Sequence, residues 1–148
     1  MGADSNTAQL NLDSECIDSL LEAARYNDID DVKNLAAIGV SLNSNDAQGR
    51  TALHMASANG HVDVVNYLIF NKVDVNACNV ENNTPLHWAC VNGHIEVLKI
   101  LILAGAKVSN LNRHERTPMD EAAISGKMEV IDAINAAVAQ ADLAGTSI

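Results

Sequence analysis

A repeat of 33 residues constrains this chain more than any other feature. Residues 47–79 read AQGRTALHMASANGHVDVVNYLIFNKVDVNACN, and residues 80–112 read VENNTPLHWACVNGHIEVLKILILAGAKVSNLN. Aligned without a gap, the two segments share a Thr, a Leu-His pair, an Ala, a Gly-His pair and several aliphatic positions. Periods of this length are typical of solenoids, in which each copy is one unit that stacks on its neighbours. The pattern therefore predicts a stack of similar units.

Two weaker copies flank this pair. Residues 113–145 keep Thr117-Pro118 and Gly126, and residues 14–46 keep Leu20 and Gly39. Terminal repeats are expected to differ from inner ones, because they present a polar outer face to water. Residues 14–46 hold seven acids and two bases, and residues 113–145 hold six and three, whereas the two inner copies are neutral. We therefore predict repeats at 14–46, 47–79, 80–112 and 113–145, between a flexible N-terminal tail (1–13) and a C-terminal tail (146–148).

Each copy reads as two short helices. Thr51 and Thr84 are suited to N-cap a helix, and the helix from about 52 to 59 ends at Gly60, which supplies a left-handed turn. A second helix, from about 62 to 70, has a one-sided apolar stripe. Helices this short are unstable in isolation, so stacking must supply their stability.

The run from Thr84 to Leu101 resembles the ankyrin-repeat family, which carries Thr-Pro-Leu-His, two small residues, a Gly-His turn and a Val-Val-x-x-Leu helix. The resemblance covers about residues 14–145. It implies an all-α solenoid of four stacked helix-turn-helix repeats, with β-hairpin-like tips projecting at right angles and a concave face.

Some positions depart from the family pattern. Glu115 stands where the tips have Gly49 and Asn82, a position that requires positive φ, so we expect strain in the last tip. Lys72 replaces the glycine that follows the second helix. The outer copies lack the His of Thr-Pro-Leu-His and carry Leu21 and Asp120 there.

Stability should be concentrated in the middle of the stack. Leu101 belongs to a copy with neighbours on both sides, whereas Leu35 and Ile134 lie in the outer copies. Because a solenoid's stability is close to a sum of repeat and interface terms, truncating Leu101 should cost more than truncating either of the others.

No residue pattern indicates a metal site, a cofactor site or catalysis. His54 and His87 recur one repeat apart, about 10 Å in a stack of packed helices, which is too far to share a zinc ion. The resemblance implies that they bond backbone groups of their own turn and of the adjacent tip. Cys90 occupies a small core position and is expected to be buried and inert. Motifs of hydrolases, phosphate loops and metalloproteases are absent from the sequence.

Charge, apolar runs and cysteine content limit the kinds of partner and compartment that we expect. The formal charge of −10 argues against broad binding to nucleic-acid phosphates and favours basic partners, although solubility alone also accounts for it. The sequence has no apolar run long enough to span a membrane, and residues 1–13 do not resemble a secretory signal. Three cysteines without a Cys-x-x-Cys pair favour a reducing compartment, so we expect a cytoplasmic or nuclear protein. We expect it to be a monomer.

Similarity to the family implies that partners contact the tips and the first helix of each repeat. The candidate protein-binding residues are Arg50, Met55, Asn59, Glu81, Asn83, Trp88, Val91, Asn92, Arg113, His114, Arg116 and Glu121. Trp88 leads this set because it is the only Trp, aromatic residues dominate binding hot spots, and the next copy replaces it with Glu121. The alternative is that Trp88 merely packs on Met55 and Val91.

Two functional hypotheses follow. The first is a non-enzymatic adaptor or escort that holds a client protein on the concave face. The chain looks like small eukaryotic ankyrin proteins, some of which chaperone basic clients such as ribosomal proteins. The second is an ankyrin-type inhibitor or a regulatory subunit of an enzyme or signalling complex.

Overall fold

The computed structural model describes residues 2–145 of the 148, with side chains described from Asp13 onward. Within that range the secondary structure is helical apart from turns and one isolated β-bridge. The helices are α1 (Gly2–Arg25), α2 (Ile29–Ala37), α3 (Ala52–Ala58), α4 (Val62–Phe70), α5 (Pro85–Val91), α6 (Ile95–Leu103), α7 (Pro118–Ile124) and α8 (Met128–Leu143). The two helices predicted for the second copy are confirmed to within a residue.

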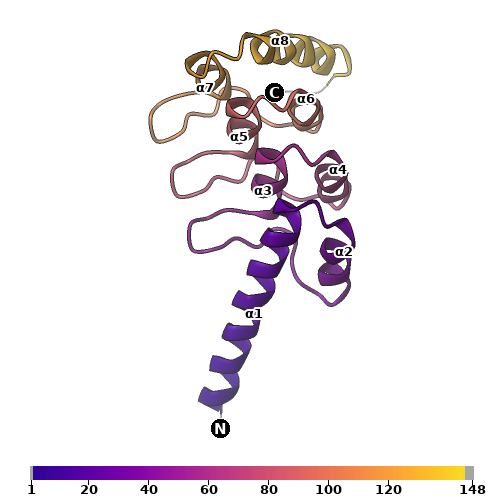
Figure 1. The fold of residues 1–148 in the computed structure, drawn as a ribbon, viewed down its shortest axis with the longest axis vertical. Helices are drawn as coiled ribbons and strands as arrows, with labels where there is room; N and C mark the ends of the chain where they lie inside the picture. The colour runs from indigo at the N-terminus through magenta and orange to yellow at the C-terminus, as the bar shows by residue number, and fades with distance from the viewer. Residues whose placement is uncertain (1, 146–148) are drawn as a thin grey trace.

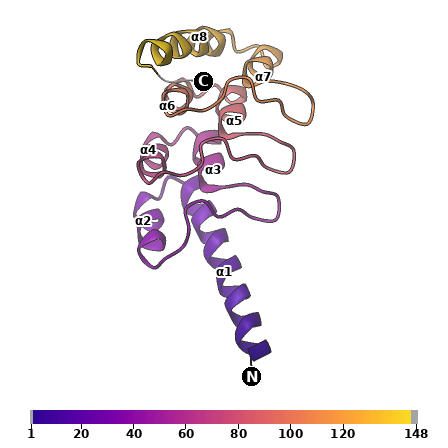
Figure 2. The ribbon, with the colours of Figure 1, turned by 180° about the vertical axis from the view of Figure 1, so that it is seen from behind.

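Consecutive helices pair and the pairs stack in chain order (Figure 1). The inner helices α1, α3 and α5 each pack on the next inner helix, the last of which is α7, and α4 and α6 pack on the outer helices that follow them. Three loops project to the side opposite the outer helices, as both views show (Figures 1 and 2). The predicted all-α repeat solenoid is confirmed.

The two ends of the stack have longer helices than the middle. Helix α1 has 24 residues and begins at Gly2, so its first turns occupy positions at which we expected a flexible tail. The sequence has neither Gly nor Pro between Ala3 and Arg25, so nothing there interrupts a helix. Helix α8 has 16 residues. The C-terminal tail predicted at 146–148 lies outside the described residues.

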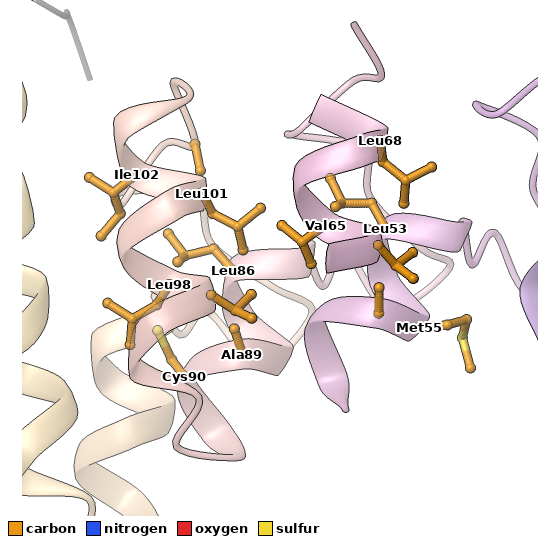
Figure 3. Close-up of a cluster of buried hydrophobic side chains, with 14 of the residues drawn as sticks. Leu53, Met55, Val65, Leu68, Leu86, Ala89, Cys90, Leu98, Leu101 and Ile102 are labelled. Carbon is orange, nitrogen blue, oxygen red and sulfur yellow. The ribbon is translucent and has the colours of Figure 1, made fainter. Parts of the chain in front are cut away.

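Small aliphatic side chains fill one core that continues through the repeats (Figure 3). Leu53, Leu68, Leu86 and Leu101 are each at most 1% exposed. Ile134 is also 1% exposed, because the long α8 lies against α6. Because of this burial, we now expect truncation of Ile134 to cost nearly as much as truncation of Leu101, although its place in an outer copy predicts a smaller cost.

One buried polar group in this core is unsatisfied. Ser57 is 0% exposed, and its hydroxyl has no hydrogen-bond partner among the described residues. The equivalent positions hold Cys90 and Ala123. Because an unpaired buried polar group costs about 1–3 kcal/mol, Ser57→Ala should raise the free energy of unfolding by about 1 kcal/mol. Urea unfolding followed by circular dichroism measures this, and a lower midpoint for the variant would contradict it.

The three tips share one turn geometry. In each, the side-chain Oδ1 of Asp46, Asn79 or Asn112 accepts hydrogen bonds from the backbone N–H groups two and four residues later, at 2.9–3.1 Å. Adjacent tips are also joined, because Val80 N–H donates to Gln48 O at 3.0 Å and Arg113 N–H donates to Glu81 O at 2.8 Å. The tips therefore form a continuous wall along the stack.

The last tip contains the strain predicted at Glu115. Its φ is +60°, close to the +60° of Asn82 and the +77° of Gly49 at the equivalent positions. A non-glycine residue is disfavoured there by about 1 kcal/mol, and the extra freedom of glycine in the unfolded chain offsets part of this. Glu115→Gly should therefore raise the free energy of unfolding by a few tenths to about 1 kcal/mol, measured by urea titration.

Gly49→Ala is the matched control for that variant. A Cβ at Gly49 would lie 3.0 Å from the Cα of Asn79 in the next tip, in addition to requiring positive φ. The substitution at Gly49 should therefore lower the urea midpoint. A midpoint that does not rise for Glu115→Gly would mean that this turn is not strained in solution.

Candidate protein-binding groove

One histidine in each of the two inner repeats binds its repeat to the tip that follows it. His54 Nδ1 accepts the Thr51 N–H at 3.2 Å, so the proton lies on Nε2, which donates to Asn83 O at 2.8 Å. His87 repeats this arrangement with Thr84 N–H and Arg116 O, at 3.1 and 2.9 Å. Both threonines also cap their helices, as predicted. These contacts hold the tips at a fixed angle to the inner helices.

Burial lowers the pKa of His54 and of His87 below the ordinary 6.5. The folded state thus binds fewer protons near pH 6 than the unfolded state does, so stability falls as the pH drops below about 6.5. The urea midpoint should be clearly lower at pH 5.5 than at pH 7.5. The pKa of Asp46 lies below 3.8 because hydrogen bonds from Arg50 outweigh its burial, and hydrogen bonds from Thr117 lower the pKa of Asp120. The contribution of these two carboxylates to folding stability is therefore lost only in stronger acid. A flat profile between pH 5.5 and 7.5 would contradict burial of the two neutral rings.

A second histidine in each of the two inner repeats binds that repeat to the one before it. His61 Nε2–H donates to Arg25 O at 2.7 Å, and His94 Nε2–H donates to Ala58 O at 3.0 Å. A Cβ on Gly60 would lie 2.6 Å from His94 Nδ1, which explains why the turn residue is glycine. All four repeated histidines therefore hold the stack together.

A hollow of about 280 Å³ lies between the third and fourth repeats, where the tips meet the inner helices. Trp88 lies at its wall, half-buried, with its ring edge-on to His54 at 5.3 Å between centroids and 71° between planes. We call this the Trp88 hollow. Its lining residues are Glu81, Asn83, His87, Trp88, Val91, Asn112, His114, Arg116 and Glu121. The structure thus brings together seven of the twelve candidate binding residues.

A hydrogen-bonded network forms the polar side of the Trp88 hollow. Asn112, 5% exposed, donates from Nδ2 to Asn83 Oδ1 and to Glu121 Oε1, both at 3.0 Å. Arg116 Nη1 lies 3.6 Å from the same Glu121 oxygen. Glu121 is thereby partly neutralised, whereas Glu81 remains exposed. Asn112 was not among the residues predicted from the sequence, although an Asp or Asn at all three equivalent tip positions was the available signal.

The other candidate residues are spread along the repeats. Arg50 is paired with Asp46, at 2.7 Å from Nη2 and 2.8 Å from Nε. Asn59 and Asn92 cap the ends of α3 and α5, and Arg113 is exposed on the third tip. Met55 is only 5% exposed and belongs to the core, so it offers a partner little surface.

The thiols and carboxylates form no reactive arrangement in the described range. Burial raises the pKa of Cys90 to about 12, so this thiol stays protonated at neutral pH and is inert, as expected of a small core residue. Residues 13–145, whose side chains the structure describes, contain no group of three or more His, Cys, Asp and Glu placed to hold a metal ion. In the same range, no helix is both long and apolar enough to cross a bilayer.

Comparison with known families decides the identity of these repeats. A family model of three consecutive ankyrin repeats matches residues 20–112, which is more than half of the chain. The chain is an ankyrin-repeat protein. Ankyrin repeats are protein-binding modules and are generally non-catalytic. The wall of tips and the row of inner helices thus form the groove of an ankyrin stack.

Two similar proteins are the liver isoforms of mitochondrial glutaminase. The Rattus norvegicus protein is 43% identical over 51 residues, and the Mus musculus protein is 39% identical over 51 residues. Each match covers 34% of this ankyrin chain and 8% of the glutaminase, so the chain spans under a tenth of the length of these curated relatives. The similarity is confined to the ankyrin region and gives no evidence of enzymatic activity.

Proposed function

We propose that this ankyrin protein is a non-enzymatic adaptor or escort that holds one client protein in the groove between its tips and inner helices. The Trp88 hollow carries the proposal. It combines an aromatic ring and an apolar neighbour, Val91, with a hydrogen-bonded polar side, which is the composition of a binding hot spot. Its volume, about 280 Å³, and its open shape suit side chains of a protein partner better than an enclosed small molecule.

The charge of the chain supports a basic client. The net charge of −10 accelerates association with positively charged partners and disfavours nucleic acid. A reducing compartment, the cytosol or the nucleus, belongs to the same proposal. The three free thiols of Cys16, Cys78 and Cys90 are compatible with it.

A pull-down with tagged protein, followed by mass spectrometry, tests the proposal. The same experiment with Trp88→Ala identifies the proteins that depend on the groove, and Phe70→Ala is the control, because Phe70 is 80% exposed on the outer helix α4. The proposal predicts clients that Trp88→Ala loses and Phe70→Ala retains. A stoichiometric enzyme among the captured proteins would instead favour an inhibitor or regulatory subunit.

A further inference from the structure

The groove changes in chemistry along its length. Its C-terminal half has an apolar floor, formed by the half-buried Trp88 and Val91 and by Ile124, which is 61% exposed. Ile124 holds in α7 the position that Val91 holds in α5. In the N-terminal half the exposed side chains of Asp18 and Glu22, on α1, take the place of this apolar surface.

The acidic half is not neutralised by its neighbours. Asp18 and Glu22 line a hollow of about 250 Å³ together with Arg25, Asp46 and Arg50. Since Arg50 and Asp46 are bonded to each other, their charges cancel. Neither Asp18 nor Glu22 forms an ion pair within the described part of the chain, which leaves Arg25 as the cation opposite two carboxylates.

Further carboxylates lie near the acidic half. Asp28, Asp30 and Asp31 lie at the turn after α1, and the negative charge of Asp28 raises the pKa of the exposed Asp31. At the other end, Arg113 and Arg116 share the last tip with Glu115, and Glu81 and Glu121 line the Trp88 hollow. A positively charged side chain is therefore attracted to the carboxylates of the N-terminal half of the groove, whereas the apolar floor of the C-terminal half suits an apolar side chain.

We infer that the groove binds an extended peptide segment of the client, with a Lys or Arg at Asp18 and Glu22 and a large apolar side chain on Trp88, Val91 and Ile124. This inference rests on the proposed function. It adds which side chains of the client are bound and which end of the groove each of them occupies. Packed helices lie about 8–10 Å apart, so α1 and α5, with α3 between them, are about 16–20 Å apart. An extended chain rises about 3.3 Å per residue. The basic and apolar side chains are therefore separated by about five or six positions.

Panning a phage library of random twelve-residue peptides on the full chain tests this inference. Enriched peptides should carry Lys or Arg five or six positions from Leu, Phe or Trp. A synthetic peptide of an enriched sequence, lacking Trp, should shift the fluorescence of Trp88, the only Trp in the chain. Asp18→Lys with Glu22→Lys should weaken this peptide at least tenfold at low salt. Glu129→Lys with Asp132→Lys, which makes the same charge change on α8, should weaken it much less.

The outcomes separate this inference from the proposed function. Peptides that need Trp88 but contain no basic residue would overturn the inference and leave the groove as the binding site. An equal loss for both charge reversals would also overturn it, because net charge would then explain the effect. If no enriched peptide depended on Trp88, the inference would fail, and the pull-down with Trp88→Ala would decide the proposed function separately. Circular dichroism verifies that each variant is folded.

Discussion

Replacing Leu101 with alanine should lower the free energy of unfolding by about 2–5 kcal/mol, as truncation of a buried leucine does. Leu101 is 0% exposed on α6 and lies in the core between the second helix pair and the long α8 (Figure 3). The structure provides little space for the surroundings to collapse, because helices pack on both sides of α6. Urea unfolding followed by circular dichroism measures the loss.

Leu103→Ala is the matched control, since Leu103 lies on the same helix and is 37% exposed. It should cost clearly less than Leu101→Ala. Ile134→Ala should cost nearly as much as Leu101→Ala, whereas the half-buried Leu35 should be less sensitive. If Leu103→Ala proved as damaging as Leu101→Ala, stability would not follow burial in this stack.

Replacing Trp88 with alanine should weaken client binding by about 2 kcal/mol or more, roughly thirtyfold, as loss of an aromatic hot spot does. Trp88 is half-buried, so part of its ring is available to a partner while the rest contacts His54. Isothermal titration with a client from the pull-down gives the loss.

The helical spectrum separates binding from folding for this variant. Trp88→Ala should retain it, with at most a modest fall in melting temperature from the lost contact with His54. Phe70→Ala should bind as the parent does, because its side chain lies on an outer helix. Unfolding of Trp88→Ala would assign the ring to the core, and normal binding would exclude the Trp88 hollow as the main contact.

Much of the fold follows from local rules that the repeat makes visible. A Thr that caps a helix and a Gly that ends it recur at fixed spacing, so α3 to α6 are predictable to within a residue. Positive φ at Glu115 was predictable because Gly49 and Asn82 stand at the equivalent positions. The repeats can thus be compared with one another, which gives information that usually requires an alignment of several sequences.

Other features depend on contacts that the repeat does not encode. The length of α8, and with it the burial of Ile134, depends on packing against α6 at the end of the stack. Helix α1 begins at Gly2, within the segment for which we expected a flexible tail. No Gly or Pro interrupts the helix between Ala3 and Arg25. The binding residues were predicted from the family likeness, whereas the network around Asn112 required the three-dimensional arrangement of tip and helix.

Asp120 affects how firmly a further repeat could attach to the C-terminal end of the stack. It occupies the histidine position of the last repeat and still accepts the Thr117 N–H, at 2.9 Å, so α7 is capped as α3 and α5 are. An ionised carboxylate has no proton to donate, so it cannot make the bond that His54 and His87 make to the following tip. A repeat grafted beyond α8 should therefore be more stable with Asp120→His than without it. One side chain thus removes a polar contact to any following tip, independently of the core.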